Sequence, residues 1–457
     1  MTQANALATF DTSLSLLVDA LRASFSSEVI EAGWIVVNAS GQLTFIAAQV
    51  LDAAETTEAR ERAGADLGAY LNPNFGIVSV EEAGISAIVR RASHYTVRVE
   101  VRGEFIDVRL IDQRLVGRDW LSSPATMPVG GIPAVVFASL KGGVGRTTAL
   151  AVVAAHLAAR GRKVLVVDLD LEAPGIGAML LGESELPRFG MLDAFVESGV
   201  TTISDDFLLD MVSASSFGAG RGLIDVAPAI GSIADRHPAN VLAKLARAYV
   251  DAFDDEGNTI SFGARARQII DRLAALKTYD LVLVDARAGL NESTAAALLG
   301  LGANILLFGE DTPQTFADYR YLLAHLARFG RDPESDWVTR LKMVQAKASP
   351  VAGDQQGFRD RIHEVFSEFL YVDRPVAPVA SSDDLLNAIL LSEFALDDAG
   401  APHHALPVLM DPNYFRFDPR NSPNVLDEAL YRHTYDALLK WVDELVEAFE
   451  EAVNDAG

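Results

Sequence analysis

The chain has 457 residues, more than one average domain, so we expect two domains or one large domain with an appendage. Acidic residues outnumber basic ones 63 to 38, and the net charge of −25 disfavours non-specific nucleic-acid binding, which needs a basic surface. Because cysteine is absent, disulfides, zinc–cysteine sites and thiol nucleophiles are excluded, and we expect a cytoplasmic location. The first residues lack the basic region of a signal peptide, so none is predicted.

Residues 1–125 are predicted to form a small N-terminal α+β domain of unknown role. A helical pattern covers about residues 14–25. Later, YTVRVEVRGEFIDVRLID (Tyr95–Asp112) alternates apolar and charged side chains on either side of Gly103, which is typical of a β-hairpin with one exposed face. The stretch Ser122–Pro133, SSPATMPVGGIP, is rich in proline and glycine and is predicted to be the linker to the next domain.

Residues 126–457 are predicted to form an α/β domain with a mostly parallel sheet flanked by helices. Near-continuous apolar runs alternate here with helical patterns, as expected for parallel strands that are buried on both faces. The runs are AVVFAS, VLVVDLD, GLIDVAPA, LVLVDA, NILLFG and LKMVQA.

Two segments of this domain invite a membrane interpretation, which their residues disfavour. The uncharged run between Glu292 and Glu310 is shorter than the ~20 residues of a membrane span, and its glycines predict a buried helix, a turn and a buried strand. The tail, residues 423–454, is predicted to be one long helix that Ser422 and Pro423 open. One face of this helix is apolar and the other strongly acidic, whereas membrane-surface helices are basic there. We therefore expect it to dock on the domain or on a protein partner.

The loop KGGVGRTT, residues 141–148, lies between the run AVVFAS and the helical stretch TALAVVAAHLAAR. A strand, a glycine-rich loop and a helix in this order are the context of a phosphate-binding loop. Its three glycines let backbone N–H groups approach phosphate oxygens, and the helix N-terminus adds positive potential. Thr147 would place its hydroxyl on Mg²⁺. The loop therefore predicts a nucleotide site, and its context disfavours a purely structural glycine turn.

Three aspartates lie where apolar strands of this sheet end. Asp168 and Asp170 end one run, and Asp285 ends another. Carboxylates at these ends of parallel strands face the ligand crevice. One can support a magnesium ion and another can orient a water for attack on a γ-phosphate. A single strand-end aspartate would be explained as a helix cap, but three at matching positions favour a site.

Together these motifs resemble the MinD/ParA group of P-loop ATPases. KGGVGRTT is similar to the group's deviant Walker A motif, KGGxGK[ST]T, with Lys141 at the signature position. VVDLDLEAPG resembles the strand that leads into switch I, and YDLVLVDARAGL resembles the Walker B and switch II segment. The resemblance covers about residues 132–390 and implies a P-loop NTPase fold with ATP and Mg²⁺ as ligands. It also marks about residues 185–270 as an insertion near the switches.

The resemblance implies a role for each matching residue. Lys141 would reach the phosphates of a partner subunit, and Asp170 would position the attacking water. The nucleotide-binding residues would be Gly142, Gly143, Val144, Gly145, Arg146, Thr147 and Thr148, and the metal-binding residues would be Thr147, Asp168 and Asp285. The adenine-reading segment is expected after LKMVQAKAS, without a named residue.

Arg146 departs from the group, which has lysine at this position. Arginine keeps the charge but is longer, planar and forked. It can bond the β- and γ-phosphates and permit turnover, hold ATP with a misplaced γ-phosphate, or turn away and leave a weak site. Because Thr147, Asp170 and Asp285 are retained, the sequence favours an ATPase of slow rate, with Asp170, Lys141 and Arg146 as its catalytic residues.

Two functions remain open. The first is a Mg²⁺-dependent ATPase switch that forms a homodimer or engages a protein partner of unknown identity in its ATP state. The second is a non-hydrolysing, ATP-bound scaffold or regulatory subunit of a bacterial multi-protein assembly. Neither nucleic acid nor membrane is favoured as a partner, because the chain and its tail are acidic. Arg265 and Arg267 are expected on a solvated helix face, and His403 and His404 in a solvated loop.

Overall fold

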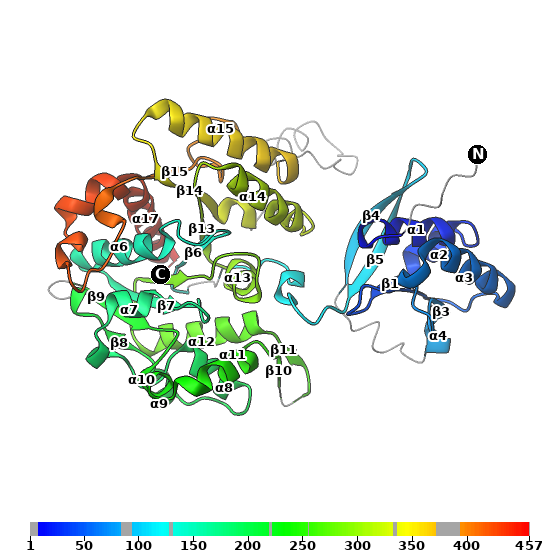
Figure 1. The fold of residues 1–457 in the computed structure, drawn as a ribbon, viewed down its shortest axis with the longest axis horizontal. Helices are drawn as coiled ribbons and strands as arrows, with labels where there is room; N and C mark the ends of the chain where they lie inside the picture. The colour runs from blue at the N-terminus through cyan, green and yellow to red at the C-terminus, as the bar shows by residue number, and fades with distance from the viewer. Residues whose placement is uncertain are drawn as a thin grey trace. The chain divides into compact units, whose positions relative to one another are not determined.

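The structure, a computed structural model, describes residues 8–83, 94–127, 131–218, 222–254, 256–331, 336–371 and 394–456. It divides into two compact units, Met1–Leu121 and Ser122–Gly457 (Figure 1). Each unit has its own sheet and its own hydrophobic core, so each is described by itself.

The first unit packs helices against a five-stranded mixed sheet of order β3-β2-β1-β5-β4. Its strands are β1 (Trp34–Val37), β2 (Leu43–Ala47), β3 (Ile77–Ser79), β4 (Tyr95–Val101) and β5 (Glu104–Asp112). Its helices are α1 (Phe10–Arg22), α2 (Ser27–Ala32), α3 (Ala53–Leu67) and α4 (Val80–Ala83). Apolar side chains of α1, α3 and the sheet share one buried core, because each helix turns its apolar stripe toward the strands.

The hairpin predicted for residues 95–112 is confirmed. β4 and β5 pair antiparallel along the whole of β4. Arg102 and Gly103 form the turn with positive φ values of 52° and 81°, which match the twist of a tight hairpin. Val99 is buried and Arg98 is exposed, so the hairpin has one face on the core and one in water.

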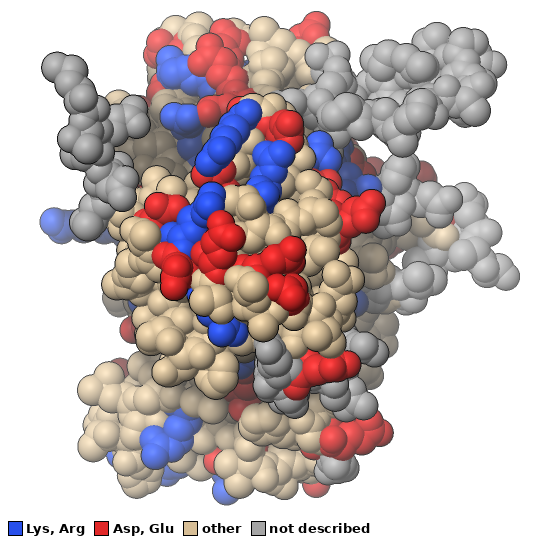
Figure 2. Space-filling view, turned by 90° about the vertical axis from the view of Figure 1, so that its right-hand side faces the viewer, with Lys and Arg blue, Asp and Glu red and all other residues tan. Residues whose placement is uncertain are grey.

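The exposed arginines of this hairpin are paired with carboxylates. Arg98 Nε lies 2.8 Å from Asp107 Oδ1, and Arg102 Nε lies 2.8 Å from Asp19 Oδ1 of α1. Figure 2 shows lysine and arginine interspersed with aspartate and glutamate on one face of the molecule. The two arginines therefore do not form the single-sign basic stripe that nucleic-acid backbones require.

The second unit is built on an eight-stranded sheet of order β15-β14-β13-β6-β12-β7-β9-β8. Every neighbouring pair is parallel except β8 and β9. The strands are β6 (Ala134–Ser139), β7 (Lys163–Asp168), β8 (Ser213–Ala214), β9 (Leu223–Ala227), β12 (Leu281–Asp285), β13 (Asn304–Gly309), β14 (Leu341–Ala348) and β15 (Leu406–Leu409). The predicted α/β fold with a mostly parallel sheet is thus confirmed.

Helices follow most strands of this sheet, as parallel connections require (Figure 1). They are α6 (Arg146–Ala159), α7 (Ile176–Leu180), α8 (Met191–Ser198), α9 (Asp205–Leu209), α10 (Ser232–Arg236), α11 (Val241–Ala248), α12 (Phe262–Leu276), α13 (Glu292–Ala295), α14 (Pro313–Leu326), α15 (Ala352–Phe369) and α17 (Glu428–Ala456). A two-stranded hairpin, β10 (Ala252–Phe253) and β11 (Thr259–Ile260), precedes α12. One core cluster joins α6, α17 and the sheet.

The C-terminal helix begins later than predicted. Pro423–Leu426 form a short 3₁₀ turn, and Asp427 then has extended backbone angles of φ −76° and ψ 136°. The prediction of one helix over 423–454 is therefore wrong at its start. Proline fits the first turn of a 3₁₀ helix as well as that of an α-helix, so the sequence signal does not distinguish the two.

α17 docks on its own unit through its apolar stripe. Leu438 and Val442 are fully buried in the core that also contains α6. His156 of α6, itself fully buried, places Nε2 3.0 Å from Asp443 Oδ2 of α17. This polar contact, beside ion pairs from Arg160 and Arg162 to α17, helps to fix the position of α17.

The uncharged run that ends before Glu310 forms the predicted helix, turn and strand. α13 continues as one π-helical turn, Ala296–Gly300. Gly302 turns the chain with a φ of 63°, and β13 follows. Among the described residues, no helix is both long enough and apolar enough to cross a membrane.

Two expectations of solvated side chains are wrong. Arg265 is 2% exposed and donates to three backbone carbonyls, so it holds α12 to the rest of the insertion. Arg267 is only partly exposed and donates to the carbonyl of Thr126 in the linker. His403 is fully buried with Nδ1 3.0 Å from the Tyr371 hydroxyl, and burial lowers the pKa of His403 to about 4. Helix faces and loops that fold back onto the domain carry no local signal of this burial.

Candidate functional site

The glycine loop (Lys141–Thr148) joins β6 to α6. Gly143 and Gly145 have φ values of 76° and 89°, which side chains other than glycine rarely adopt. A Cβ at either position would meet no atom within 4 Å, so the inner surface of the loop is open. Val144, between the two glycines, is buried in the core and anchors the loop. The loop therefore presents backbone N–H groups around an open concavity at the start of α6.

The strand-end carboxylates (Asp168, Asp170 and Asp285) come together beside this loop. β12 pairs with both β6 and β7, and Asp285 is the register partner of Asp168. Asp170 follows two residues later. Asp168 and Asp285 are fully buried, and Asp170 is nearly so. The predicted meeting of the three at one edge of the sheet follows from the parallel register.

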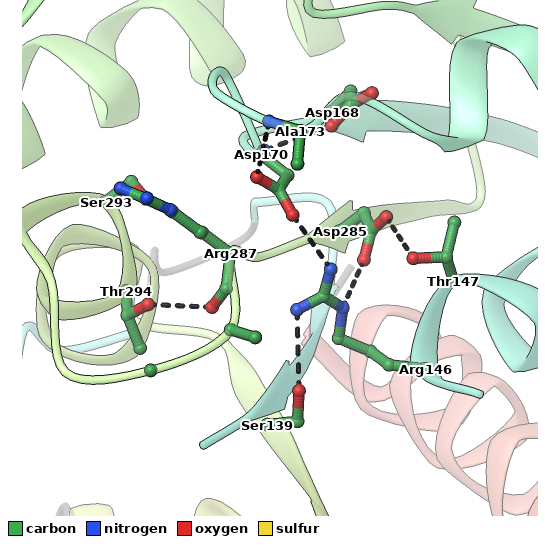
Figure 3. A network of polar contacts seen from close by, with 12 residues as sticks. Ser139, Arg146, Thr147, Asp168, Asp170, Ala173, Asp285, Arg287, Ser293 and Thr294 are labelled. Carbon is green, nitrogen blue, oxygen red and sulfur yellow. Dashed lines mark hydrogen bonds and ion pairs between the residues drawn. The ribbon is translucent and has the colours of Figure 1, made fainter. Parts of the chain in front are cut away.

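Arg146 points into this carboxylate cluster (Figure 3). Its Nε–H donates to Asp285 Oδ1 at 2.7 Å, and its Nη2 donates to Asp170 Oδ2 at 3.2 Å. Its Nη1 lies 3.5 Å from the hydroxyl of Ser139 at the end of β6. In the structure, the guanidinium is therefore bonded to two strand-end carboxylates and lies beside Ser139.

The remaining oxygens of the cluster are placed by nearby groups. The Thr147 hydroxyl donates to Asp285 Oδ2 at 2.8 Å. Asp170 Oδ1 accepts from the Ala173 N–H at 3.2 Å, and Asp168 Oδ1 accepts from the Asp170 N–H at 3.0 Å. Asp168 Oδ2 is buried without a hydrogen-bond partner among the described residues. An orphaned carboxylate oxygen of this kind is a position where a further donor or cation fits.

The electrostatics of the cluster are unbalanced. Burial raises the pKa of Asp168 well above its ordinary value, and the charge of Asp285 raises it further. Burial also raises the pKa of Asp285, although Arg146 and the Thr147 hydroxyl oppose this. Among the described residues, the cluster has three carboxyl groups but only one cationic side chain, that of Arg146. Oxygen ligands such as these are the ones that Mg²⁺ prefers. The residues present therefore fit a magnesium ion, provided that Arg146 releases them.

An open cavity of about 690 Å³ extends from the glycine loop to a group of apolar side chains. Its far wall consists of Met410, Tyr414, Phe415 and Phe417, from the segment after β15. Phe415 is 62% exposed, an unusual position for a large aromatic side chain. Sequence reasoning missed this wall, although DPNYFRF directly after an apolar strand is a signal for it. Lys347, near the end of β14, also lines the cavity, whereas the adenine-reading segment was expected after Ser349.

Lys141 lies at the flank of the loop and is ion-paired within its own chain. Its Nζ is 3.5 Å from Glu310 Oε2, and Lys347 Nζ is 2.6 Å from Glu310 Oε1. Both lysines are partly exposed, so solvent screens these contacts.

A second polar contact connects the loops that follow β7 and β12. Arg287, two residues after Asp285, donates to Glu172 Oε1 at 2.6 Å. Tyr249, from the region predicted to be an insertion, lies against the same carboxylate: burial raises the pKa of the Tyr249 hydroxyl, and Glu172 raises it further. Sequence reasoning did not select any of these three residues, because nothing in a single sequence relates positions so far apart.

Part of the chain matches a known protein family. Residues 133–308 match a family model described as an AAA domain. A search of curated protein sequences gives no match. The chain is similar to a ParA family ATPase from Chlorobium tepidum TLS, with 16% identity, a TM-score of 0.39, and coverage of 68% of this chain and 98% of that chain. It is similar to pNOB8 ParA bound to nonspecific DNA, with 18% identity, a TM-score of 0.41, and coverage of 69% and 99%. The MinD cell division protein of Aquifex aeolicus has 17% identity, a TM-score of 0.39, and coverage of 69% and 97%.

At these TM-scores the solved structures add no argument of their own. The family match carries the relationship, together with a glycine loop between β6 and α6 and aspartates at the ends of β7 and β12. Through residues 133–308, which match the AAA domain family, the chain resembles the MinD/ParA-like P-loop ATPases, as its sequence motifs predict.

Proposed function

We propose that this chain binds ATP with its phosphates in the glycine loop and hydrolyses it slowly, as a molecular switch. The observation that carries the proposal is the open concavity at Gly143 and Gly145, with Thr147 and Asp285 hydrogen-bonded to each other beside it. Backbone N–H groups, a helix N-terminus and a hydroxyl–carboxylate pair are the parts that phosphoryl transfer from ATP requires.

Each predicted residue has a distinct task in this proposal. Gly142 to Gly145 surround the phosphates, with Val144 as the anchor, and Thr148 lies near the α-phosphate. Thr147, Asp168 and Asp285 hold Mg²⁺, directly or through water. When bound, the ion neutralises charge that develops on the phosphate oxygens. Asp170 orients the attacking water by accepting its hydrogen bond.

The far wall of the cavity suits the base of the nucleotide. Met410, Tyr414 and Phe415 offer apolar and aromatic surface on which a purine can stack. A bound base would also account for the exposure of Phe415, because it would cover that ring. We therefore assign base recognition to the segment after β15, rather than to the segment directly after LKMVQAKAS.

Arg146 accounts for the slow rate that we propose. Its bonds to Asp170 and Asp285 withhold the water-orienting and metal-holding carboxylates from their tasks. Turnover then requires the guanidinium to leave buried partners, which adds to the barrier. Once released, it can bond phosphate oxygens with its forked donors.

The contacts around Glu172 suggest how a change in the bound nucleotide is transmitted to a partner protein. Arg287 and Glu172 connect the loops that carry Asp285 and Asp170, and Tyr249 extends this contact to the insertion. Movement of either loop would therefore alter the surface of the insertion. We propose that the chain is cytoplasmic and forms a homodimer in its ATP state, in which Lys141 leaves Glu310 and contacts the partner subunit. The alternative is that the chain engages another protein in its ATP state.

A second candidate is a non-hydrolysing scaffold that keeps ATP bound. The position of Arg146 favours it, because a guanidinium that stays on Asp170 and Asp285 leaves no carboxylate for the water. The two candidates make the same prediction for binding and opposite predictions for turnover.

Phosphate release from Mg·ATP by the purified chain, beside Asp170→Ala at equal concentration, decides between them. The switch predicts measurable release that falls at least tenfold in the variant. Asp235→Ala, on the short helix α10 away from the cavity lining, is the matched control and should behave as wild type. ATP binding without release in any of the three proteins would favour the scaffold, and absence of binding would contradict both candidates.

A further inference from the structure

Arg146 holds the carboxylates that the glycine loop would otherwise offer to a metal ion. Asp285 accepts from Arg146 Nε on one oxygen and from Thr147 on the other. Asp170 accepts from Arg146 Nη2 on one oxygen and from the Ala173 N–H on the other. All four oxygens of the two carboxylates thus have donors from the chain itself (Figure 3).

Because this network is buried, Arg146 excludes a metal ion from the two carboxylates. The side chains of Arg146 and Asp170 are each 9% exposed, and that of Asp285 is 1% exposed. Water screens charges weakly at such positions, so a second cation between the same carboxylates would be repelled by the guanidinium. A metal ion can take these oxygens only after Arg146 has moved.

The cavity gives Arg146 a second partner. Arg146 lines it together with Gly142 to Gly145, where phosphate oxygens would lie. A triphosphate carries more negative charge than the two carboxylates and accepts the forked guanidinium on two oxygens. Only an arginine has the planar fork that holds both carboxylates at once, so this exchange follows from the residue that departs from the usual lysine.

We propose that Arg146 makes this loop take up the metal-free nucleoside triphosphate first, and that the metal site opens only when the guanidinium has passed from Asp170 and Asp285 to the phosphates. The inference rests on the proposed nucleotide binding and specifies the form of the ligand. Such a site differs from one that binds the preformed complex of magnesium and the nucleoside triphosphate.

Calorimetric titration with Mn²⁺ alone tests the blocked metal site. Wild type should bind no Mn²⁺ at submillimolar concentration, and Arg146→Met, which keeps length but removes charge, should gain at least tenfold in affinity. Arg287→Met is the matched control, because this arginine lines the same cavity but pairs with Glu172. It should bind Mn²⁺ as weakly as wild type. Equal Mn²⁺ affinity of wild type and Arg146→Met would overturn the proposal.

A measurement on wild type alone covers the case in which Arg146→Met does not fold. ATP binding is measured in EDTA and again in excess Mg²⁺. The proposal predicts that wild type binds ATP with measurable affinity in EDTA, without any metal ion. ATP that binds only with Mg²⁺ contradicts this inference alone, whereas no ATP binding in either buffer contradicts the proposed function as well.

Discussion

Arg146 Nε donates to Asp285 Oδ1 at 2.7 Å, so the first residue of α6 is bonded to the last residue of the neighbouring strand β12. Asp170 and Ser139 complete the surroundings of the guanidinium. The residue that departs from the expected lysine is therefore part of a closed polar network rather than a solvated substitute.

Removing the charge of Arg146 should destabilise the second unit. Arg146→Met leaves two buried carboxylates without their cation, and we expect a loss of about 3 kcal/mol in the free energy of unfolding. Urea unfolding followed by circular dichroism measures it. Arg98→Met, which breaks an exposed ion pair, should cost below about 1 kcal/mol. A loss of similar size in both variants would show that the buried network is not stabilising.

The Thr147 hydroxyl should matter for turnover more than for folding. Thr147→Val keeps the shape but removes the donor to Asp285 and the proposed metal ligand. We expect phosphate release to fall at least tenfold, with a stability loss of about 1 kcal/mol. Thr315→Val, which removes a buried hydroxyl on α14 outside the cavity lining, is the control and should retain the turnover. Unchanged release in Thr147→Val would remove this hydroxyl from the site.

The stability contributed by Asp168 should depend on pH with a defined sign. Burial raises its folded pKa above the ordinary 3.8, so the folded chain holds this proton more tightly than the unfolded chain. Its contribution is complete below about pH 3.8 and is lost as the pH rises through the folded pKa. Asp168→Asn cannot lose a proton, so its stability relative to wild type should increase from pH 4 toward neutrality, measured by urea unfolding at each pH.

Asp254 provides a control of opposite sign. Hydrogen bonds from Asn258 lower the pKa of this exposed carboxyl, so its contribution is lost as the pH falls. Asp254→Asn should therefore differ most from wild type at neutral pH, as the less stable protein. A pH-independent difference for Asp168→Asn would contradict the account of a carboxyl raised by burial.

The contact between α6 and α17 should hold the C-terminal helix in place. Asp443→Ala leaves buried His156 without its carboxylate, and we expect a loss of about 1–3 kcal/mol in the free energy of unfolding. Asp436→Ala, which removes an exposed contact with Lys440 on the same helix, should cost below about 0.5 kcal/mol. Equal small effects would show that the contact between His156 and Asp443 does not hold α17 in place.

The elements with strong local signals could be predicted from the sequence. Continuous apolar strands, the glycine loop and strand-end aspartates predicted the parallel sheet, and the register of β7 and β12 then brings Asp168 and Asp285 together. The direction of Arg146 could not be predicted, because three arrangements of its guanidinium were physically open.

Long-range contacts account for the other differences. The partners of Glu172 come from positions far apart in the chain, Arg287 and Tyr249, and a single sequence gives no signal for such contacts. His403 was expected in water because proline and glycine surround it, yet the loop folds inward and buries it. Residue composition predicts that a segment is a loop, but it does not predict whether the side chains of that loop are buried.

The most direct test of the account is calorimetric titration of ATP into wild type and Gly143→Ala. A methyl group at Gly143 forces a residue other than glycine to a φ of 76° and places carbon where the phosphates are proposed to lie. Gly103→Ala is the matched control, with a φ of 81°, equally open space and a position in the first unit. We predict that ATP binds wild type and Gly103→Ala alike and binds Gly143→Ala at least tenfold more weakly. Equal binding to all three proteins would contradict a phosphate site in the glycine loop.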